Sequence, residues 1–172
     1  MTAQGERRIV LVRHAKAVPK GTIDDFDRPL ADRGRREAPK AGQWLAESGH
    51  PLGLALCSSA LRTRETWQLM VSRLPEPPPA VYEDRLYNAD TDTLMAVLAE
   101  TGEAVTDLLM VGHNSGIHEL AVALCGTGPE SLVRRIRDGF PTSAVVVLAL
   151  PGKWQDVAPG TGRPAAFWAP GD

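Results

Sequence analysis

Short blocks of consecutive apolar residues alternate along this chain with longer segments in which apolar residues recur every three or four positions. Blocks of the first kind predict strands buried on both faces, and segments of the second kind predict amphipathic helices. Strands are predicted at 9–12, 52–57, 80–82, 106–111 and 143–150. Helices are predicted at 30–48, 60–74, 91–100 and 117–124, with a short one around 134–137. This alternation predicts an α/β fold, a three-layer sandwich with a mostly parallel central sheet flanked by helices.

Prolines and glycines modify this pattern at three places. Pro39 lies inside the first predicted helix, where it should kink or shorten it. Residues 154–158 are expected to pair with the last long strand as a hairpin across Pro151 and Gly152. Residues 159–172 are rich in glycine and proline and are expected to form an irregular tail of a single domain spanning residues 1–172.

Composition narrows the classes of function. The length of 172 residues suits one domain, and a net charge of −2 argues against nucleic-acid binding. The two cysteines, Cys57 and Cys125, are far apart in sequence and predict reduced thiols rather than a disulfide or a zinc site. The longest apolar run, 144–150, is too short to cross a bilayer, and no signal-peptide core precedes the first strand. We therefore expect a soluble cytoplasmic protein, with its oligomeric state left open.

Polar side chains directly follow three of the predicted strands. Arg13 and His14 follow the first strand, and His113 and Asn114 follow the strand at 106–111. Arg62 lies in the first turn of the helix that follows the second strand. The carboxyl ends of parallel strands meet at one edge of a sheet, where helix N-termini and guanidinium groups favour an anion. An imidazole at this edge can attack a phosphoryl group, so the pattern predicts phosphoryl chemistry on His14.

Each of these residues also has an ordinary structural explanation. A single arginine at a strand end is usually a surface ion pair, and a single histidine there usually caps or packs. Asn114 can cap the helix that follows it, and His118 falls on the face of that helix. Two histidines and two arginines at one edge of a sheet favour a site over these separate explanations.

Four ordered blocks between Leu11 and Leu124 resemble the histidine phosphatase superfamily, which has the phosphoglycerate mutase-like fold. The blocks are Leu-Val-Arg-His-Ala from Leu11, Arg-Pro-Leu from Arg28, Ser-Ser-Ala-Leu-Arg-Thr-Arg-Glu-Thr from Ser58, and Val-Gly-His-Asn-Ser-Gly from Val111. Ala15 stands where the family signature has glycine. A short chain without a large inserted cap is most similar to the SixA-type phosphohistidine phosphatases.

The resemblance implies a role for each matching residue. His14 would be the nucleophile that forms a phosphohistidine, and Arg13, Arg62 and His113 would complete the phosphate pocket, with Asn114 beside them. No metal or other cofactor would be required.

The position of the general acid departs from the family pattern. Many relatives carry a glutamate just after the third strand, but alignment on Leu86 places Arg85 at that position. Glu83 is the expected acid, with Asp84 or no acid as the alternatives. Glu83 could equally be an exposed loop charge.

The expected function is phosphatase activity through a phosphohistidine intermediate, on phosphohistidine in a protein. A phosphohistidine substrate can carry a proton on its own leaving imidazole. A site without a defined general acid therefore suits this substrate better than it suits an alkyl phosphate. The alternatives are a phosphomonoesterase for sugar or nucleotide phosphates, and a non-catalytic phosphate-binding module. The partner would be a phosphorylated protein or a small phosphorylated metabolite, not nucleic acid or a membrane.

Overall fold

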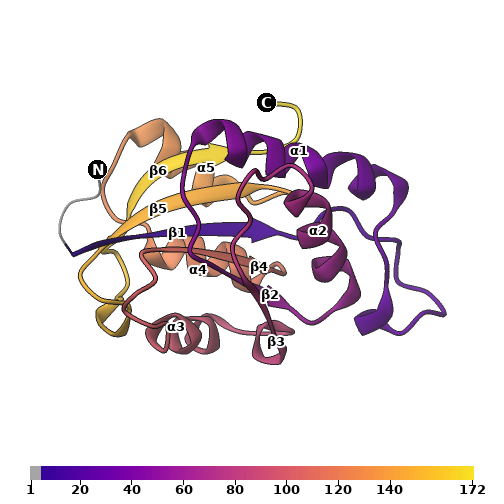
Figure 1. Cartoon of the computed structure of the whole chain (residues 1–172), viewed down its shortest axis with the longest axis horizontal. Helices are drawn as coiled ribbons and strands as arrows, with labels where there is room; N and C mark the ends of the chain where they lie inside the picture. Colours follow the sequence, from indigo (N-terminus) through magenta and orange to yellow (C-terminus); the bar gives the residue numbers. More distant parts are fainter. Residues whose placement is uncertain (1–4) are drawn as a thin grey trace.

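The apolar block at 9–12 forms the middle of a strand that lies near the centre of a six-stranded sheet (Figure 1). The computed structural model describes residues 5–172. The strands are β1 (Glu6–Arg13), β2 (Leu54–Ser58), β3 (Ala80–Glu83), β4 (Asp107–Gly112), β5 (Val145–Pro151) and β6 (Arg163–Trp168). The helices are α1 (Asp32–Ser48), α2 (Leu61–Val71), α3 (Thr91–Ala99), α4 (Gly116–Leu124) and α5 (Glu130–Asp138). Three short 3₁₀ turns are η1 (Asp25–Asp27), η2 (Asp84–Leu86) and η3 (Trp154–Asp156).

The strand order is β3-β2-β4-β1-β5-β6, and the first four strands in this order are parallel. β5 runs antiparallel to β1, and β6 runs antiparallel to β5. The predicted α/β fold with a mostly parallel sheet is therefore confirmed. The carboxyl ends of β1, β2 and β4 lie side by side, which brings together the segments that carry the predicted site residues.

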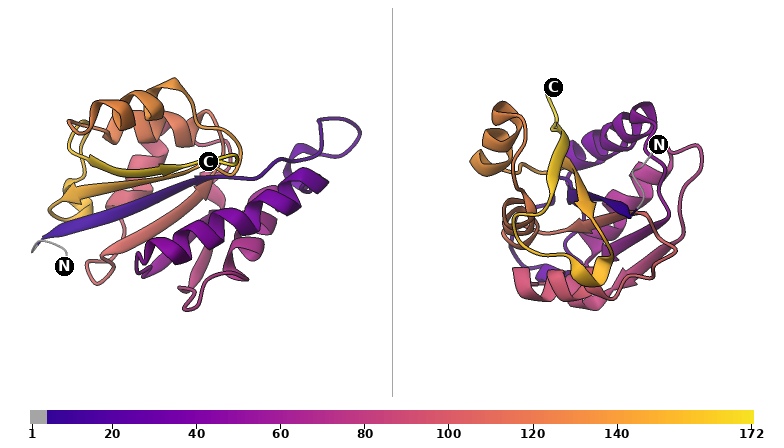
Figure 2. Two further views of the ribbon diagram at one scale, coloured as in Figure 1. Left: turned by 90° about the horizontal axis from the view of Figure 1, so that it is seen from above. Right: turned by 90° about the vertical axis from the view of Figure 1, so that its left-hand side faces the viewer.

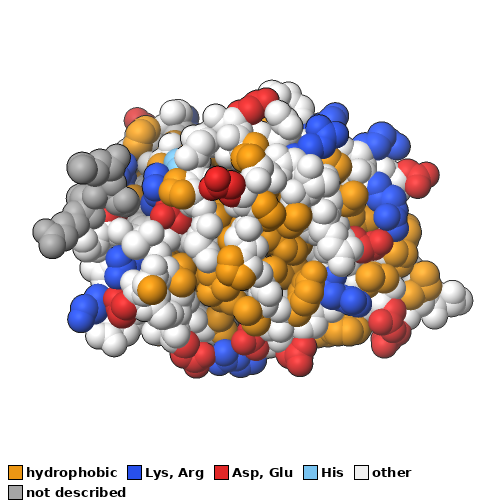
Figure 3. Space-filling model, viewed as in Figure 1, with side chains coloured by type: hydrophobic (Ala, Val, Ile, Leu, Met, Phe, Trp, Pro, Cys, Tyr) orange, Lys and Arg blue, Asp and Glu red, His pale blue; other side chains and the backbone are white. Residues whose placement is uncertain are grey.

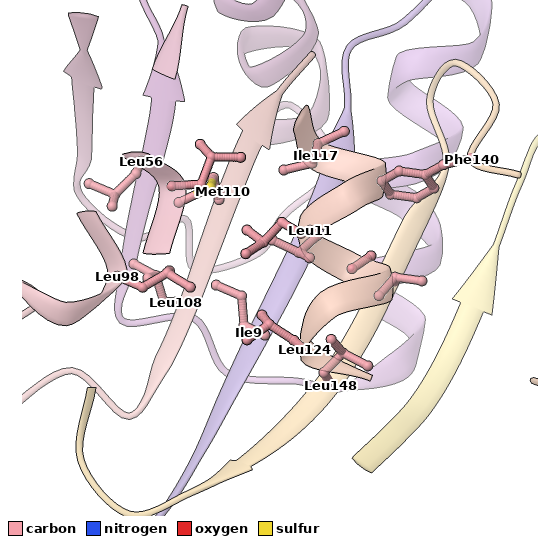
Figure 4. Close-up of a cluster of buried hydrophobic side chains, with 14 of the residues drawn as sticks. Ile9, Leu11, Leu56, Leu98, Leu108, Met110, Ile117, Leu124, Phe140 and Leu148 are labelled. Carbon is pink, nitrogen blue, oxygen red and sulfur yellow. The ribbon is translucent and has the colours of Figure 1, made fainter. Parts of the chain in front are cut away.

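Helices cover both faces of the sheet, with α1 and α2 on one face and α3, α4 and α5 on the other (Figure 2). The two cores explain why β1 is continuously apolar. Ile9 and Leu11 pack toward α4, as the close-up shows (Figure 4). Val10 and Val12 pack into the opposite core, which includes Trp67 of α2. Alternate residues of a strand point to opposite faces of the sheet. Because helices cover both faces here, both sets of side chains are buried and apolar.

One of the expectations from the proline and glycine pattern is wrong, and two are wrong in part. α1 continues through Pro39 over 17 residues, so the proline does not shorten the helix. Residues 154–156 form η3 instead of the second strand of a hairpin. The expected irregular tail contains β6, which pairs with the apolar strand β5 and is offset by an irregularity near Val147. Pro164 fits there because β6 is an edge strand, where a missing N–H can face away from the ladder.

The segment between β1 and α1 extends beyond the carboxyl end of the sheet, where Figure 2 shows it as the dark loop in the left-hand view. An antiparallel bridge between Ala17 and Leu30 holds the base of this loop. On the face shown in Figure 3, hydrophobic side chains gather in the middle and charged side chains surround them. No helix within residues 5–172 has both the length and the apolar character needed to span a membrane.

Candidate active site

His14 lies directly beyond the end of β1 and is only 9% exposed. Its Nδ1 lies 2.7 Å from the backbone oxygen of Ala15. A carbonyl oxygen can only accept, so Nδ1 carries the proton and the lone pair is on Nε2. Burial, together with the nearby cations Arg62 and Arg13, lowers the pKa of His14 to about 4 against the opposing hydrogen bond to Ala15. At neutral pH His14 is therefore an uncharged imidazole with a free nucleophilic nitrogen.

His113 follows β4, and its ring centroid lies 5.3 Å from that of His14. Its Nε2 is 2.7 Å from the hydroxyl oxygen of Ser58, at the end of β2. The Ala60 N–H also donates to this hydroxyl oxygen, which has one proton and two lone pairs and so can either donate to His113 Nε2 or accept from it. Burial, followed by repulsion from His14 when that ring is protonated and from Arg62, lowers the pKa of His113 to about 3.

Three buried nitrogen atoms of the predicted site have no hydrogen-bond partner among the described residues. They are Nε of Arg13, Nε of Arg62 and Nδ1 of His113. Within residues 5–172, only two other buried side-chain nitrogen or oxygen atoms lack a partner. Buried polar groups in native proteins are almost always paired. The two arginine nitrogens carry protons, and a tetrahedral oxyanion bound in the site would supply acceptors for them.

Asp25 of η1 is the carboxylate of the site. It accepts hydrogen bonds from Arg28 at 3.0 Å, from Arg62 at 3.2 Å and from the Tyr87 hydroxyl at 2.6 Å. The Tyr87 hydrogen bond, and then those of the two arginines, hold the pKa of Asp25 well below its usual range. In return, the Asp25 carboxylate raises the pKa of Tyr87. Asp25 is therefore ionised and Tyr87 protonated at neutral pH.

A cavity of about 290 Å³ opens over His14. Its lining consists of Arg13, His14, Lys16, Ala17, Lys20, Asp25, Arg28, Arg62, Asn88, His113, Asn114 and Thr142. Ligand cavities in proteins usually have volumes of about 300 to 1,000 Å³, so this one suits a phosphoryl group and part of the group that carries it. The lining is polar and cationic, which fits an anion and not an apolar ligand.

The backbone carbonyl of Phe140 connects two of the strand ends. It accepts a hydrogen bond from Arg13 at 3.1 Å and one from the Asn114 side chain at 2.9 Å. Asn114 thus lines the cavity, and its amide is oriented by the hydrogen bond to Phe140. Its side chain makes no cap hydrogen bond at the start of α4, so the structure does not support the interpretation of Asn114 as a helix cap.

The structure brings together Arg13, His14, Arg62, His113 and Asn114, as expected, but not Glu83. The Glu83 carboxylate accepts from the backbone N–H and the guanidinium of Arg85 and lines a different cavity together with Glu100. These hydrogen bonds lower its pKa, so Glu83 is ionised as well as misplaced. The expectation that Glu83 joins the site is corrected. Asp84, the alternative, is also outside the cavity and bonds the Ser59 hydroxyl.

Asp25 and Tyr87 are among the site residues that the sequence pattern did not reveal, as are the cavity-lining lysines Lys16 and Lys20. Asp25 is one of three acidic residues in the run Asp24-Asp25-Phe26-Asp27, which gives no reason to prefer one of them. Tyr87 follows no strand. Only the folding of the loop over α2 shows that these two groups meet at Arg62.

A model of the histidine phosphatase superfamily (branch 1) matches residues 9–104. The chain belongs to this superfamily. It is 40% identical over 161 residues to an uncharacterized protein of Mycobacterium tuberculosis, covering 92% of this chain and 99% of that protein. The matched residues include most of β1, all of α1, β2, α2 and β3, and the loop after His14.

Two solved structures are similar over nearly the whole chain. A protein of Nakamurella multipartitia, described as a candidate phosphohistidine phosphatase SixA, has a TM-score of 0.84 and 29% identity, covering 98% of each chain. The protein histidine phosphatase SixA complexed with tungstate has a TM-score of 0.76 and 25% identity, covering 95% of this chain and 97% of that one. This member of the histidine phosphatase superfamily is thus SixA-like in structure.

Proposed function

We propose that this chain is a phosphatase that removes phosphate from phosphohistidine in a protein, through a phosphohistidine intermediate on His14. The observation that carries the proposal is the set of three unpartnered buried nitrogen atoms, two of them arginine donors, beside the uncharged His14 ring. The similarity to a SixA structure that holds tungstate, a tetrahedral oxyanion, supports the same interpretation.

In the first step, His14 Nε2 attacks phosphorus while the bond from phosphorus to the substrate's imidazole nitrogen breaks. Arg13, Arg62 and His113 donate hydrogen bonds to the equatorial oxygens, where negative charge is stabilised during transfer. When the leaving imidazole is protonated on its other nitrogen, it departs as a neutral ring. No acid from the protein is needed at this step.

In the second step, water attacks the phosphorus of phosphorylated His14, and the bond from phosphorus to Nε2 breaks. The hydrogen bond from Nδ1–H to Ala15 keeps the ring protonated on Nδ1, so His14 also departs as a neutral imidazole. The proton of the water goes to the released phosphate or to solvent. Inorganic phosphate leaves and the starting state of His14 returns.

The protonation state of the cavity's carboxyl group favours a phosphohistidine substrate over the alternative, a sugar or nucleotide phosphate. An alkoxide leaving group needs a proton from a general acid, which is typically worth about 100- to 10,000-fold in rate. Asp25 is the only carboxyl among the described residues that line the cavity, and it is ionised. The site therefore favours a phosphoramidate over an alkyl phosphate.

The test compares kcat/KM for a phosphohistidine peptide with that for a sugar phosphate. We expect the peptide to be hydrolysed at least about 100-fold faster, and His14→Ala to abolish both the turnover and the acid-labile labelling of the protein. Faster hydrolysis of the sugar phosphate would favour the phosphomonoesterase. A protein that is never labelled and turns over neither compound would be a non-catalytic phosphate-binding module.

A further inference from the structure

The cavity over His14 holds more positive charge than a phosphoryl group can neutralise. The cationic side chains that line it are Arg13, Lys16, Lys20, Arg28 and Arg62, and Asp25 is the one carboxylate among its described lining residues. With both histidines uncharged at neutral pH, these side chains carry a net charge of +4. A phosphoryl group carries about −1.5 to −2 at this pH, so about two positive charges remain. The whole chain has a net charge of −2, so this excess is local.

We assign this remaining positive charge to the two lysines, Lys16 and Lys20. Arg28 and Arg62 are paired with Asp25. Neither Lys16 nor Lys20 forms an ion pair with any acidic side chain in the described part of the chain. Asp24 and Asp27 belong to the same loop but are exposed and do not line the cavity.

The backbone beneath Lys16 is held in place two residues after His14. The Lys16 carbonyl accepts the Ala31 N–H at 2.9 Å, and Ala17 forms a bridge with Leu30. Gly34 of α1 packs so closely that an added Cβ would lie 2.1 Å from the Lys16 oxygen. A Lys side chain has a flexible stem, but here it starts from a fixed point at the rim of the cavity.

We propose that Lys16 and Lys20 form a second anion subsite, which recognises a carboxylate or phosphate group of the substrate beside the phosphoryl group. This inference rests on the proposed function for the identity of the phosphoryl group and narrows its substrate class. A protein substrate would carry acidic side chains next to the phosphohistidine. A metabolite would carry a second acidic group, and the two sources share the same chemistry.

The principal experiment compares kcat/KM for two phosphohistidine peptides, one with Asp and one with Asn on either side of the phosphohistidine. An exposed ion pair changes an equilibrium constant by about 1.5- to 5-fold, so two lysines should give the Asp peptide an advantage of about 2- to 25-fold, mainly in KM. The double variant Lys16→Met, Lys20→Met should bring this ratio close to 1. Lys153→Met is the matched control, because Lys153 is exposed and follows β5 at the opposite end of the sheet.

A second arm does not depend on turnover. Calorimetry gives the ratio of the Kd values of inorganic phosphate and pyrophosphate. Inhibition gives the corresponding ratio of binding constants for ethyl phosphate and phosphoglycolate, and phosphoglycolate carries an additional carboxylate. We expect the doubly anionic member of each pair to bind more tightly in the wild type, and the double variant to lose most of that difference.

The two proposals fail in different ways. A protein that hydrolyses no phosphohistidine overturns the proposed function, while the Kd ratios still decide the anion subsite. Equal rates for the two peptides together with no preference for the doubly anionic small molecules, or preferences that the double variant leaves unchanged, overturn the subsite alone. A preference seen only with the peptides identifies acidic flanking residues as the source of the anion, and one seen only with phosphoglycolate identifies a small metabolite.

Discussion

Asp25 binds Arg62 through two separate groups. Its backbone carbonyl accepts from Nη1 at 2.7 Å, and its carboxylate accepts from Nη2 at 3.2 Å. Nε has no partner, and Nη1 and Nη2 each keep a second N–H beyond the one that Asp25 accepts. The carboxylate therefore occupies a donor that an oxygen of the phosphoryl group would otherwise use, and the site binds its own anion when the substrate's is absent.

Asp25→Asn should tighten the binding of inorganic phosphate, because the asparagine carries no charge to compete for Arg28 and Arg62. Two partly exposed ion pairs are involved, so we expect Kd to fall by about 2- to 30-fold. Calorimetry measures this directly. Asp27→Asn, an exposed position in the same turn, is the control and should leave Kd unchanged. Weaker phosphate binding in Asp25→Asn would mean that the carboxylate mainly positions Arg62.

His14 and His113 should remain uncharged far below the usual pKa of histidine. Burial and the nearby cations lower the pKa values to about 4 and about 3, so both rings stay neutral at pH 5. Since the attacking His14 must be neutral, phosphoenzyme formation should persist at pH 5 and be lost as the pH falls through about 4. NMR titration of the imidazole protons measures the midpoint of each protonation. The variants His14→Ala and His113→Ala identify which resonances belong to each ring. A midpoint near 6.5 for His14 would contradict the buried, cation-flanked environment.

Arg62 and Glu83 should differ sharply in their effect on rate. Arg62→Lys keeps the charge but loses Nε and the planar donor pair, and the loss of a donor to the transferring group typically lowers kcat by about 100- to 1,000-fold. Glu83→Gln should change kcat/KM for phosphohistidine by less than about 2-fold, because its carboxylate binds Arg85 outside the cavity. Steady-state hydrolysis of a phosphohistidine peptide compares the two variants. An equal loss in both would restore Glu83 to the mechanism.

Gly34 should tolerate no side chain, although it lies inside a helix where alanine is normally favoured. An added Cβ would lie 2.1 Å from the Lys16 carbonyl oxygen, a backbone atom that cannot move without displacing the loop after His14. We expect Gly34→Ala to lower the free energy of unfolding by about 1 to 3 kcal/mol and to lower activity. Gly102→Ala is the control, since nothing lies within 4 Å of its added Cβ. Urea denaturation of both variants gives the comparison, and equal stabilities would show that the loop accommodates the methyl group.

The sequence predicted those parts of the site that depend on strand ends. The apolar blocks located the strands, and the polar residues directly after them had to meet at one edge of a parallel sheet. This reasoning was sufficient for Arg13, His14 and His113. Glu83 also lies at a strand end, as the last residue of β3, but the local hydrogen bonds to Arg85 turn its carboxylate elsewhere. A rule based on strand ends does not include this competition between side chains.

The parts that sequence reasoning missed depend on contacts between distant segments. Asp25 becomes a site residue only because its loop folds back to Arg62, 37 residues away along the chain. The strand at 163–168 forms because β5 is apolar and needs a partner on its free edge, which outweighs the local preference of glycine and proline for irregular structure. Both results are set by tertiary packing and not by local composition.

The shared carbonyl of Phe140 has a mechanical consequence. The peptide unit that follows Phe140 lies in the connection from α5 to β5 and enters the sheet against the direction of β1. One oxygen atom of this segment accepts hydrogen bonds from both the guanidinium of Arg13 and the amide of Asn114, and so sets the distance between them. A small rotation of that single peptide plane would shift both groups at once and in the same sense. The short connection before β5 thus serves as a common anchor for two segments that are 101 residues apart in sequence.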